Sequence, residues 1–179
     1  MKTKTKMLII DVILLALVIF SDQYSKHLAV LRLKGAPPFV IIEDVFEFTY
    51  LENVGAAFGM LPNQKLFFVF IAVIFLGVIA FVLSKTPDGK KYIGLHILLT
   101  MVSGGAIGNM ADRLRLNYVV DFIFVPVVRL FGQPFPVFNV ADIFITVPTV
   151  VLIFFIIIVY KDADFEFLSF KQRKYRELK

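Results

Sequence analysis

Long runs of apolar residues constrain the fold of this chain more than any other feature. Residues 66–84 and 92–111 contain no Asp, Glu, Lys or Arg, and residues 140–160 contain a single acid. Apolar runs of about 20 residues can cross the hydrocarbon core of a bilayer as helices. Residues 7–27 predict a less regular span, because they include an acid and end in polar residues. We therefore expect a polytopic α-helical membrane protein with four transmembrane helices.

The composition agrees with this class. Hydrophobic residues make up 59% of the 179 residues, and the mean hydropathy is +0.83, which is too apolar for a soluble domain of this size. The chain has no cysteine, which excludes disulfides and thiolate sites. Its two histidines, His27 and His96, are isolated and form no HExxH pattern. We therefore expect no bound metal ion and no other cofactor.

The first 25 residues have a second interpretation, as a cleaved signal peptide. The basic start MKTKTK is typical of one. However, Asp11 lies inside the apolar segment, and no small-x-small cleavage pattern follows it. These two features favour an uncleaved first span.

The distribution of Lys and Arg predicts the orientation in the membrane. Twelve of the 19 lie in the amino terminus, the 84–91 connection and the 161–179 tail. The richer side is expected to be cytoplasmic, so both termini lie inside and the loops at about 28–65 and 112–139 face outward. This topology explains the net charge of +5 better than nucleic-acid binding does. We expect the basic tail to contact anionic membrane lipids.

Strand-like patterns occur in both outer loops. Polar and apolar residues alternate over 46–50, and residues 118–124 form an apolar run that contains one acid. Such patterns predict short strands. We expect a small extracytoplasmic β-rich region built from the two loops.

Polar residues gather at the predicted outer edge of the spans. Asp22 and Lys26 are four residues apart and share a helix face, which predicts an ion pair that at the least anchors the helix end. Asn53 precedes three small residues of the segment NVGAAFG. That segment is either a simple turn or a place where backbone approaches another group closely.

The third span ends in GGAIGNMADR, residues 104–113. Its glycines can serve close helix packing, or they can leave room for the backbone of a bound peptide. Packing alone does not explain Asn109, Asp112 and Arg113, which follow within one turn. Arg113 can pair with an acid or bind a main-chain carbonyl at the interface.

Two further acids lie on either side of the second outer loop. Asp121 is in the apolar run, and Asp142 is in the first turn of the fourth span, where Asn139 is well placed as N-cap. A carboxylate in that turn is also explained by the helix dipole alone. If the two acids meet, they form a pair that shares one proton. Such a pair can activate water and protonate a leaving group.

Five blocks of the sequence together resemble the bacterial lipoprotein signal peptidase family, also called signal peptidase II. The blocks, in order, are DQYSK (22–26), NVGAAFG (53–59), GGAIGNMADR (104–113), VVDF (119–122) and FNVAD (138–142). Each block is weak alone, but five in this order with four spans are specific, and they cover nearly the whole chain.

The resemblance implies a single membrane-embedded peptidase domain over residues 1–179, located in the bacterial cytoplasmic (inner) membrane. It implies an aspartyl endopeptidase that removes the signal peptide from diacylglyceryl-modified prolipoproteins before the lipidated cysteine. The catalytic pair falls on Asp121 and Asp142, and Asp22 and Lys26 support the site. Positions that line the site in the family fall on Asn53, Gly55, Gly105, Asn109, Arg113, Asn139 and Ala141.

Some features depart from the family or leave alternatives open. The loop between Asp121 and Asn139 is a few residues longer than usual and contains Pro126 and Pro134, and Phe124 stands where many members have an acid. A serine peptidase is disfavoured, because no Ser and Lys are suitably spaced. A membrane transporter or lipid-binding protein that uses the acids as ion sites is the alternative, but it would need acids near the bilayer midplane. We expect a monomer.

Overall fold

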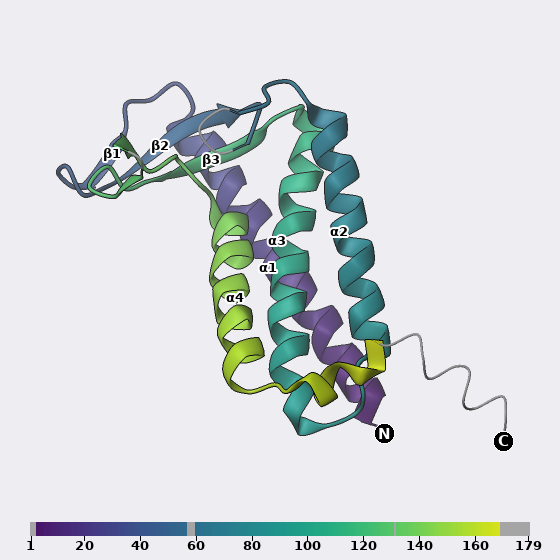
Figure 1. The fold of residues 1–179 in the computed structure, drawn as a ribbon. Helices are drawn as coiled ribbons and strands as arrows, with labels where there is room; N and C mark the ends of the chain where they lie inside the picture. The colour runs from purple at the N-terminus through teal and green to yellow at the C-terminus, as the bar shows by residue number, and fades with distance from the viewer. Residues whose placement is uncertain (1–2, 57–59, 131, 169–179) are drawn as a thin grey trace, which may run out of the picture.

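A bundle of long helices carries a small sheet at one end (Figure 1). The computed structural model describes residues 3–56, 60–130 and 132–168. Within these ranges the long helices are α1 (Thr3–Leu33), α2 (Lys65–Lys85), α3 (Ile93–Leu116) and α4 (Val140–Ile158). Short 3-10 turns, η2 (Lys90–Tyr92) and η3 (Asp162–Leu168), lie at the opposite end. Part of the NVGAAFG block, residues 57–59, and the tail segment 169–179 lie outside the described residues.

Three of the described helices are long and apolar enough to cross a membrane. They are the segments Lys65–Lys85, Lys90–Leu116 and Val140–Ile158. The outer faces of α2 and α4 expose large apolar side chains such as Leu66, Phe70 and Ile158, which suits contact with lipid. The predicted count of four spans is not confirmed. The first predicted span, 7–27, lies within the longer helix α1, whose polar far end continues to Leu33.

Helix α3 is the centre of the bundle and packs against α1, α2 and α4. Its glycines allow this packing. A Cβ atom on Gly104 would lie 2.5 Å from a side-chain atom of Val18 in α1, and one on Gly105 would lie 2.5 Å from the Ala141 carbonyl oxygen in α4. The packing interpretation of these glycines is therefore correct. The prediction that they leave room for a bound peptide is wrong for these two, because neighbouring helices already occupy that space.

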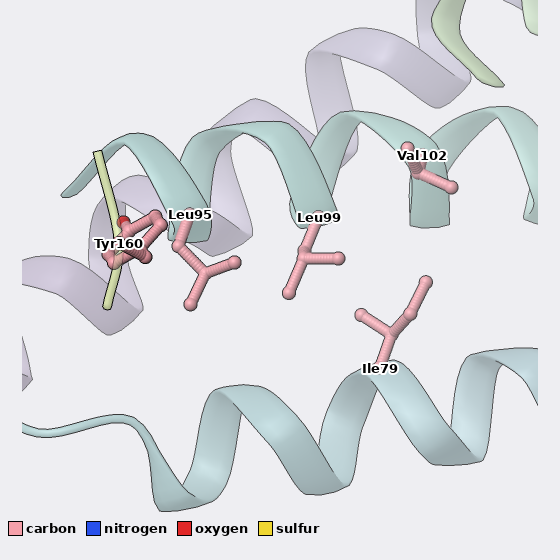
Figure 2. Close-up of a cluster of buried hydrophobic side chains, with 5 residues drawn as sticks. All are labelled: Ile79, Leu95, Leu99, Val102 and Tyr160. Carbon is pink, nitrogen blue, oxygen red and sulfur yellow. The ribbon is translucent and has the colours of Figure 1, made fainter. Parts of the chain in front are cut away.

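A cluster of buried apolar side chains joins α2, α3 and the segment after α4 at the end far from the sheet. Figure 2 shows Ile79 of α2 pointing towards α3. The cluster consists of Ile79, Leu95, Leu99, Val102 and Tyr160. This cluster holds the helices together at the end of the bundle away from the sheet.

The sheet is built from both outer loops, as the sequence predicts. Strands β1 (Phe39–Ile42), β2 (Phe46–Asn53) and β3 (Val119–Phe124) pair antiparallel in that order. The sheet packs against the far end of α1 through a second apolar cluster that includes Ala29, Val120 and Phe122. A separate hairpin, β4 (Arg129–Leu130) and β5 (Gln133–Pro134), follows β3.

The α3–α4 contact predicts that Gly105→Val destabilises the protein. The added side chain has no space beside the Ala141 carbonyl, and overpacking of this kind typically costs about 1–3 kcal/mol. Thermal unfolding followed by circular dichroism in detergent measures the change. Gly77→Val in α2 is the matched control, because nothing lies within 4 Å of its added Cβ. Equal midpoints for the two variants would contradict the packing role.

Candidate active site

Asp121 is held by two amide side chains where β3 meets the start of α4. The Nδ2 group of Asn53, at the end of β2, donates to Asp121 Oδ2 over 2.8 Å. The Nδ2 group of Asn139 donates to the other oxygen, Oδ1, over 2.6 Å. Asp121 is 2% exposed, so these bonds replace hydration that its carboxyl group has lost. Both oxygens of this carboxyl therefore have fixed partners.

Asn139 also holds Asp142, through the cap of α4. The Asn139 side-chain oxygen accepts from the Asp142 backbone N–H, and the Asn139 backbone N–H donates to Asp142 Oδ2, each over 3.0 Å. This reciprocal arrangement is a capping box, and it confirms Asn139 as the N-cap. One residue is thus bonded to both acids, which brings the predicted pair together.

A third amide, Asn109 of α3, has its orientation set by Lys26. The Lys26 ammonium can only donate, and it lies 2.7 Å from Asn109 Oδ1. The Asn109 NH2 group must then face the other way, and it donates to Asp142 Oδ1 over 2.8 Å. Asn109 Oδ1 also accepts from Asn139 Nδ2 over 3.1 Å, which directs the NH2 group of Asn139 towards Asp121. Lys26 therefore determines that both amides donate to the acids.

Lys26 is itself buried between two other carboxylates. It is 3% exposed and lies 3.0 Å from Asp22 Oδ2 and 3.0 Å from Asp112 Oδ2. Asp22 uses its second oxygen to accept from the backbone N–H of Ala141, over 2.9 Å. The absence of a side chain on Gly108 lets Asp22 approach α3. The predicted Asp22–Lys26 pair is present, and it also anchors the start of α4.

Two residues of this network were not assigned to the site from the sequence. Asp112 accepts from Gln23 Nε2 over 3.0 Å and from the Val120 backbone N–H over 3.3 Å. Gln23 also receives a hydrogen bond from Arg115. Helical spacing could have indicated Asp112, because Asn109 and Asp112 share the face of α3 that meets Asp22 and Lys26 of α1.

Arg113 holds the turn that follows β2. Its Nη2 group donates to the Gly55 carbonyl over 3.1 Å, and the Gly55 backbone N–H donates to Asn53 Oδ1 over 3.0 Å. The guanidinium lies 4.8 Å from the centre of the Phe68 ring in α2, which is cation–π geometry. Of the two expected roles, pairing with an acid or binding a carbonyl, the structure has the second.

A cavity of about 290 Å3 opens onto the two acids. Its polar wall is formed by Asn53, Asn109, Arg113, Asp121 and Asp142, with Gly55 beside them. Its apolar wall comes mostly from the hairpin segment, with Leu130, Phe135, Pro136, Val137 and Phe138. Gly105, Asn139 and Ala141 do not line the cavity: Asn139 and Ala141 are fully buried behind it, and Gly105 packs on Ala141. Their predicted direct contact with a substrate is replaced by a supporting position.

Burial is the main influence on the charge of Asp121. It raises the pKa of the Asp121 carboxyl group to about 7, and the negative charge of nearby Asp142 acts in the same direction. The hydrogen bonds from Asn53 and Asn139 oppose this shift but do not cancel it. A carboxyl group with such a pKa can hold or release a proton near neutral pH. In the described parts of the chain no group of three or more His, Cys, Asp or Glu could hold a metal ion.

Known proteins are similar to this chain in sequence and in fold. Residues 14–158 match a family model described as signal peptidase (SPase) II. Lipoprotein signal peptidases are similar to this chain: one from Caldanaerobacter subterraneus is 43% identical over 79% of the chain and 91% of the relative. Another, from Clostridium tetani, is 39% identical over 82% of the chain and 92% of the relative.

Two solved structures of bacterial membrane enzymes have a similar fold. One has a TM-score of 0.70 at 27% identity and covers 84% of this chain and 94% of its own. The other has a TM-score of 0.68 at 25% identity and covers 85% of this chain and 92% of its own.

The buried position of Lys26 predicts that Lys26→Met strongly destabilises the protein. The substitution keeps most of the length of the side chain but leaves Asp22 and Asp112 without their cation, and breaking a buried ion pair costs about 3–5 kcal/mol. Thermal unfolding in detergent measures the loss. Lys34→Met is the control, because the Lys34–Glu52 pair is exposed and should matter little. A Lys26→Met variant as stable as the control would show that the network does not hold the site.

The pKa of Asp121 predicts a titration near neutral pH. A carboxylic-acid infrared band should disappear with a midpoint near pH 7 in the wild type and be missing in Asp121→Asn. Because the native state then binds more protons than the unfolded state between pH 3.8 and about 7, the free energy of unfolding should fall as pH rises through this range. A band that persists in Asp121→Asn and is lost in Asp142→Asn would assign the proton to Asp142 instead.

Proposed function

The chain belongs to the signal peptidase II family, a family of membrane peptidases that process lipoproteins, and we propose that it is an aspartyl endopeptidase. Its substrates are diacylglyceryl-modified prolipoproteins, from which it removes the signal peptide by cleavage before the lipidated cysteine. The observation that carries this proposal is the position of Asn139, which is hydrogen-bonded to both Asp121 and Asp142 beside one cavity.

The two acids take different parts in the reaction. Asp121 is the more buried acid. It holds the shared proton, because its pKa is raised to about 7. Asp142, in the ionised form, accepts a proton from water, and the resulting hydroxide attacks the scissile carbonyl carbon. Asp121 donates its proton to the carbonyl oxygen. As the tetrahedral intermediate collapses, Asp142 passes the proton taken from water to the leaving nitrogen, and Asp121 regains its proton from the hydroxyl group. No metal ion or other cofactor is required.

The surroundings of the pair suit a lipid-anchored peptide. The polar wall offers amide and guanidinium donors, and the apolar wall adds hydrophobic surface to the same cavity. Lipid chains of a substrate can stay in the bilayer, where each buried methylene contributes about 0.8 kcal/mol to retention. The anchor then sets the depth of the scissile bond at the height of the two acids.

The proposed topology adds α1 as a fourth span. The 31 residues of α1 extend about 46 Å at 1.5 Å per residue, which exceeds the ~30 Å hydrocarbon core. Apolar side chains such as Leu8, Leu17 and Phe20 are exposed along it. Together with the Lys and Arg distribution, this supports a topology in which both termini lie in the cytoplasm and the acids lie at the outer face of the inner membrane. A monomer contains every residue named in the site.

The transporter or lipid-binding alternative has weaker support. An ion pathway would need acids near the bilayer midplane, whereas Asp121 lies in the sheet and Asp142 in the first turn of α4. Both positions are at one end of the bundle (Figure 1).

The proposed chemistry predicts that Asp121→Asn and Asp142→Asn each lower cleavage by about 10²- to 10⁴-fold, the usual range for a lost proton-transfer group. An amide can neither accept nor donate the proton. The assay compares purified variants on a diacylated prolipoprotein and on the same protein without lipid. Asp44→Asn, at an exposed turn before β2, is the matched control and should cleave normally. Near-normal turnover by either active-site variant would remove that acid from the mechanism.

The contacts of Arg113 predict that Arg113→Lys is not a conservative change. Lysine has no planar fork that could bond Gly55 and lie over Phe68 at once, so the turn beside Asp121 loses its support. We expect a loss of activity on the order of tenfold, equivalent to one charge-assisted hydrogen bond. Arg115→Lys, at a largely exposed side chain, is the control. Full activity of Arg113→Lys would mean that Arg113 only anchors α3 at the interface.

A further inference from the structure

A second and larger cavity lies among α1, α2 and α3, at the end of the bundle away from the sheet. Its volume is about 580 Å3, and it shares no lining residue with the candidate active site. Leu8, Val12 and Leu15 line it from α1, and Leu76 and Ile79 line it from α2. Nothing in the proposed peptidase reaction uses this cavity.

The cavity is longer than the hydrocarbon region of one bilayer leaflet and can therefore accommodate a lipid chain. Along α3 it runs from Tyr92 to Ile107, which is about 22 Å at 1.5 Å per residue. One leaflet of a bilayer is about half of the ~30 Å hydrocarbon core. Helices α1 and α2 both pack on α3 but have no extensive contact with each other. An apolar space of this kind offers water few hydrogen bonds, so a hydrocarbon chain is its suitable occupant.

Two acids, Asp11 and Asp88, line this cavity. Asp11 projects from α1, accepts from His96 Nδ1 over 2.8 Å and from Thr100 Oγ1 over 3.2 Å, and keeps further acceptor positions. Asp88 lies at the mouth, just after the carboxyl end of α2, where the helix dipole is negative. The lining contains no Lys or Arg. Its charge therefore complements a cation and disfavours an anion.

From this geometry we propose that the cavity binds a membrane phospholipid whose headgroup carries a primary ammonium. One acyl chain lies between α1 and α2, and the ammonium group donates to Asp11 and Asp88. This lipid belongs to the leaflet opposite the candidate active site. The inference does not depend on the peptidase activity.

The bound lipid would complete the packing of α2. Among the residues of α2, Ile79 is buried, so most of this helix has little protein around it. At its other end, Lys65 donates to the Leu114 carbonyl over 3.2 Å and Phe68 lies against Arg113. A lipid bound against the carboxyl-terminal half of α2 therefore also stabilises the position of the Phe68 ring, which contacts Arg113.

Native mass spectrometry of the full chain in detergent tests the proposal with two lipids that have the same acyl chains. Phosphatidylethanolamine supplies the primary ammonium, and phosphatidylglycerol is an anion without it. We expect the wild type to bind phosphatidylethanolamine on the order of tenfold more tightly, as one charge-assisted hydrogen bond would give. Equal binding of the two lipids would overturn the proposal.

Two variants locate the binding. Asp11→Asn should weaken the preference between the lipids, because only Asp88 then remains as a carboxylate acceptor, while the apolar contacts are retained. Ala80→Phe, which fills the cavity from α2, should weaken the binding of both lipids. Circular dichroism of each variant without lipid verifies that it is folded. An unchanged preference in Asp11→Asn, or unchanged affinity in a folded Ala80→Phe, would show that the lipid binds elsewhere.

Discussion

The candidate site depends on the contacts of one buried cation, Lys26. Its ammonium group has three donors, and the structure gives each an acceptor, in Asp22, Asp112 and Asn109. Through Asp22 it secures the start of α4, and through Asn109 it orients the amides around the two acids. An environment arranged in this way before substrate arrives needs little reorganisation during the reaction.

Much of the site could be predicted from local patterns. Asn139 had the position of an N-cap, Asp22 and Lys26 had helical spacing, and both loops that form the sheet had strand-like patterns. The contacts of Asp112 and Gln23 could not be predicted, because they join α1 to α3 across almost 90 residues. The three glycines of residues 104–113 were ambiguous for the same reason. A missing side chain identifies a close approach but not the partner, which here is another helix.

The two walls of the active-site cavity have different origins and different constraints. The polar wall comes from helices and strands whose side chains are bonded to one another, so single substitutions there affect several partners. The apolar wall comes mainly from the hairpin segment between β3 and α4. Changes in this segment can alter the fit of a substrate without disturbing the acids.

The pairing of β2 with β3 has a consequence for how errors in folding would affect this protein. Successive side chains of a strand point to opposite faces of its sheet, and here Asn53 pairs with Val119 and Leu51 with Asp121, next to an irregularity between Phe48 and Leu51. A slip of one residue would turn Asp121 away from the cavity and present Val120 or Phe122 in its place. The helices could still be inserted, yet the molecule would be inert. The hydrogen bond between Asn53 and Asp121 therefore favours the correct alignment of β2 with β3.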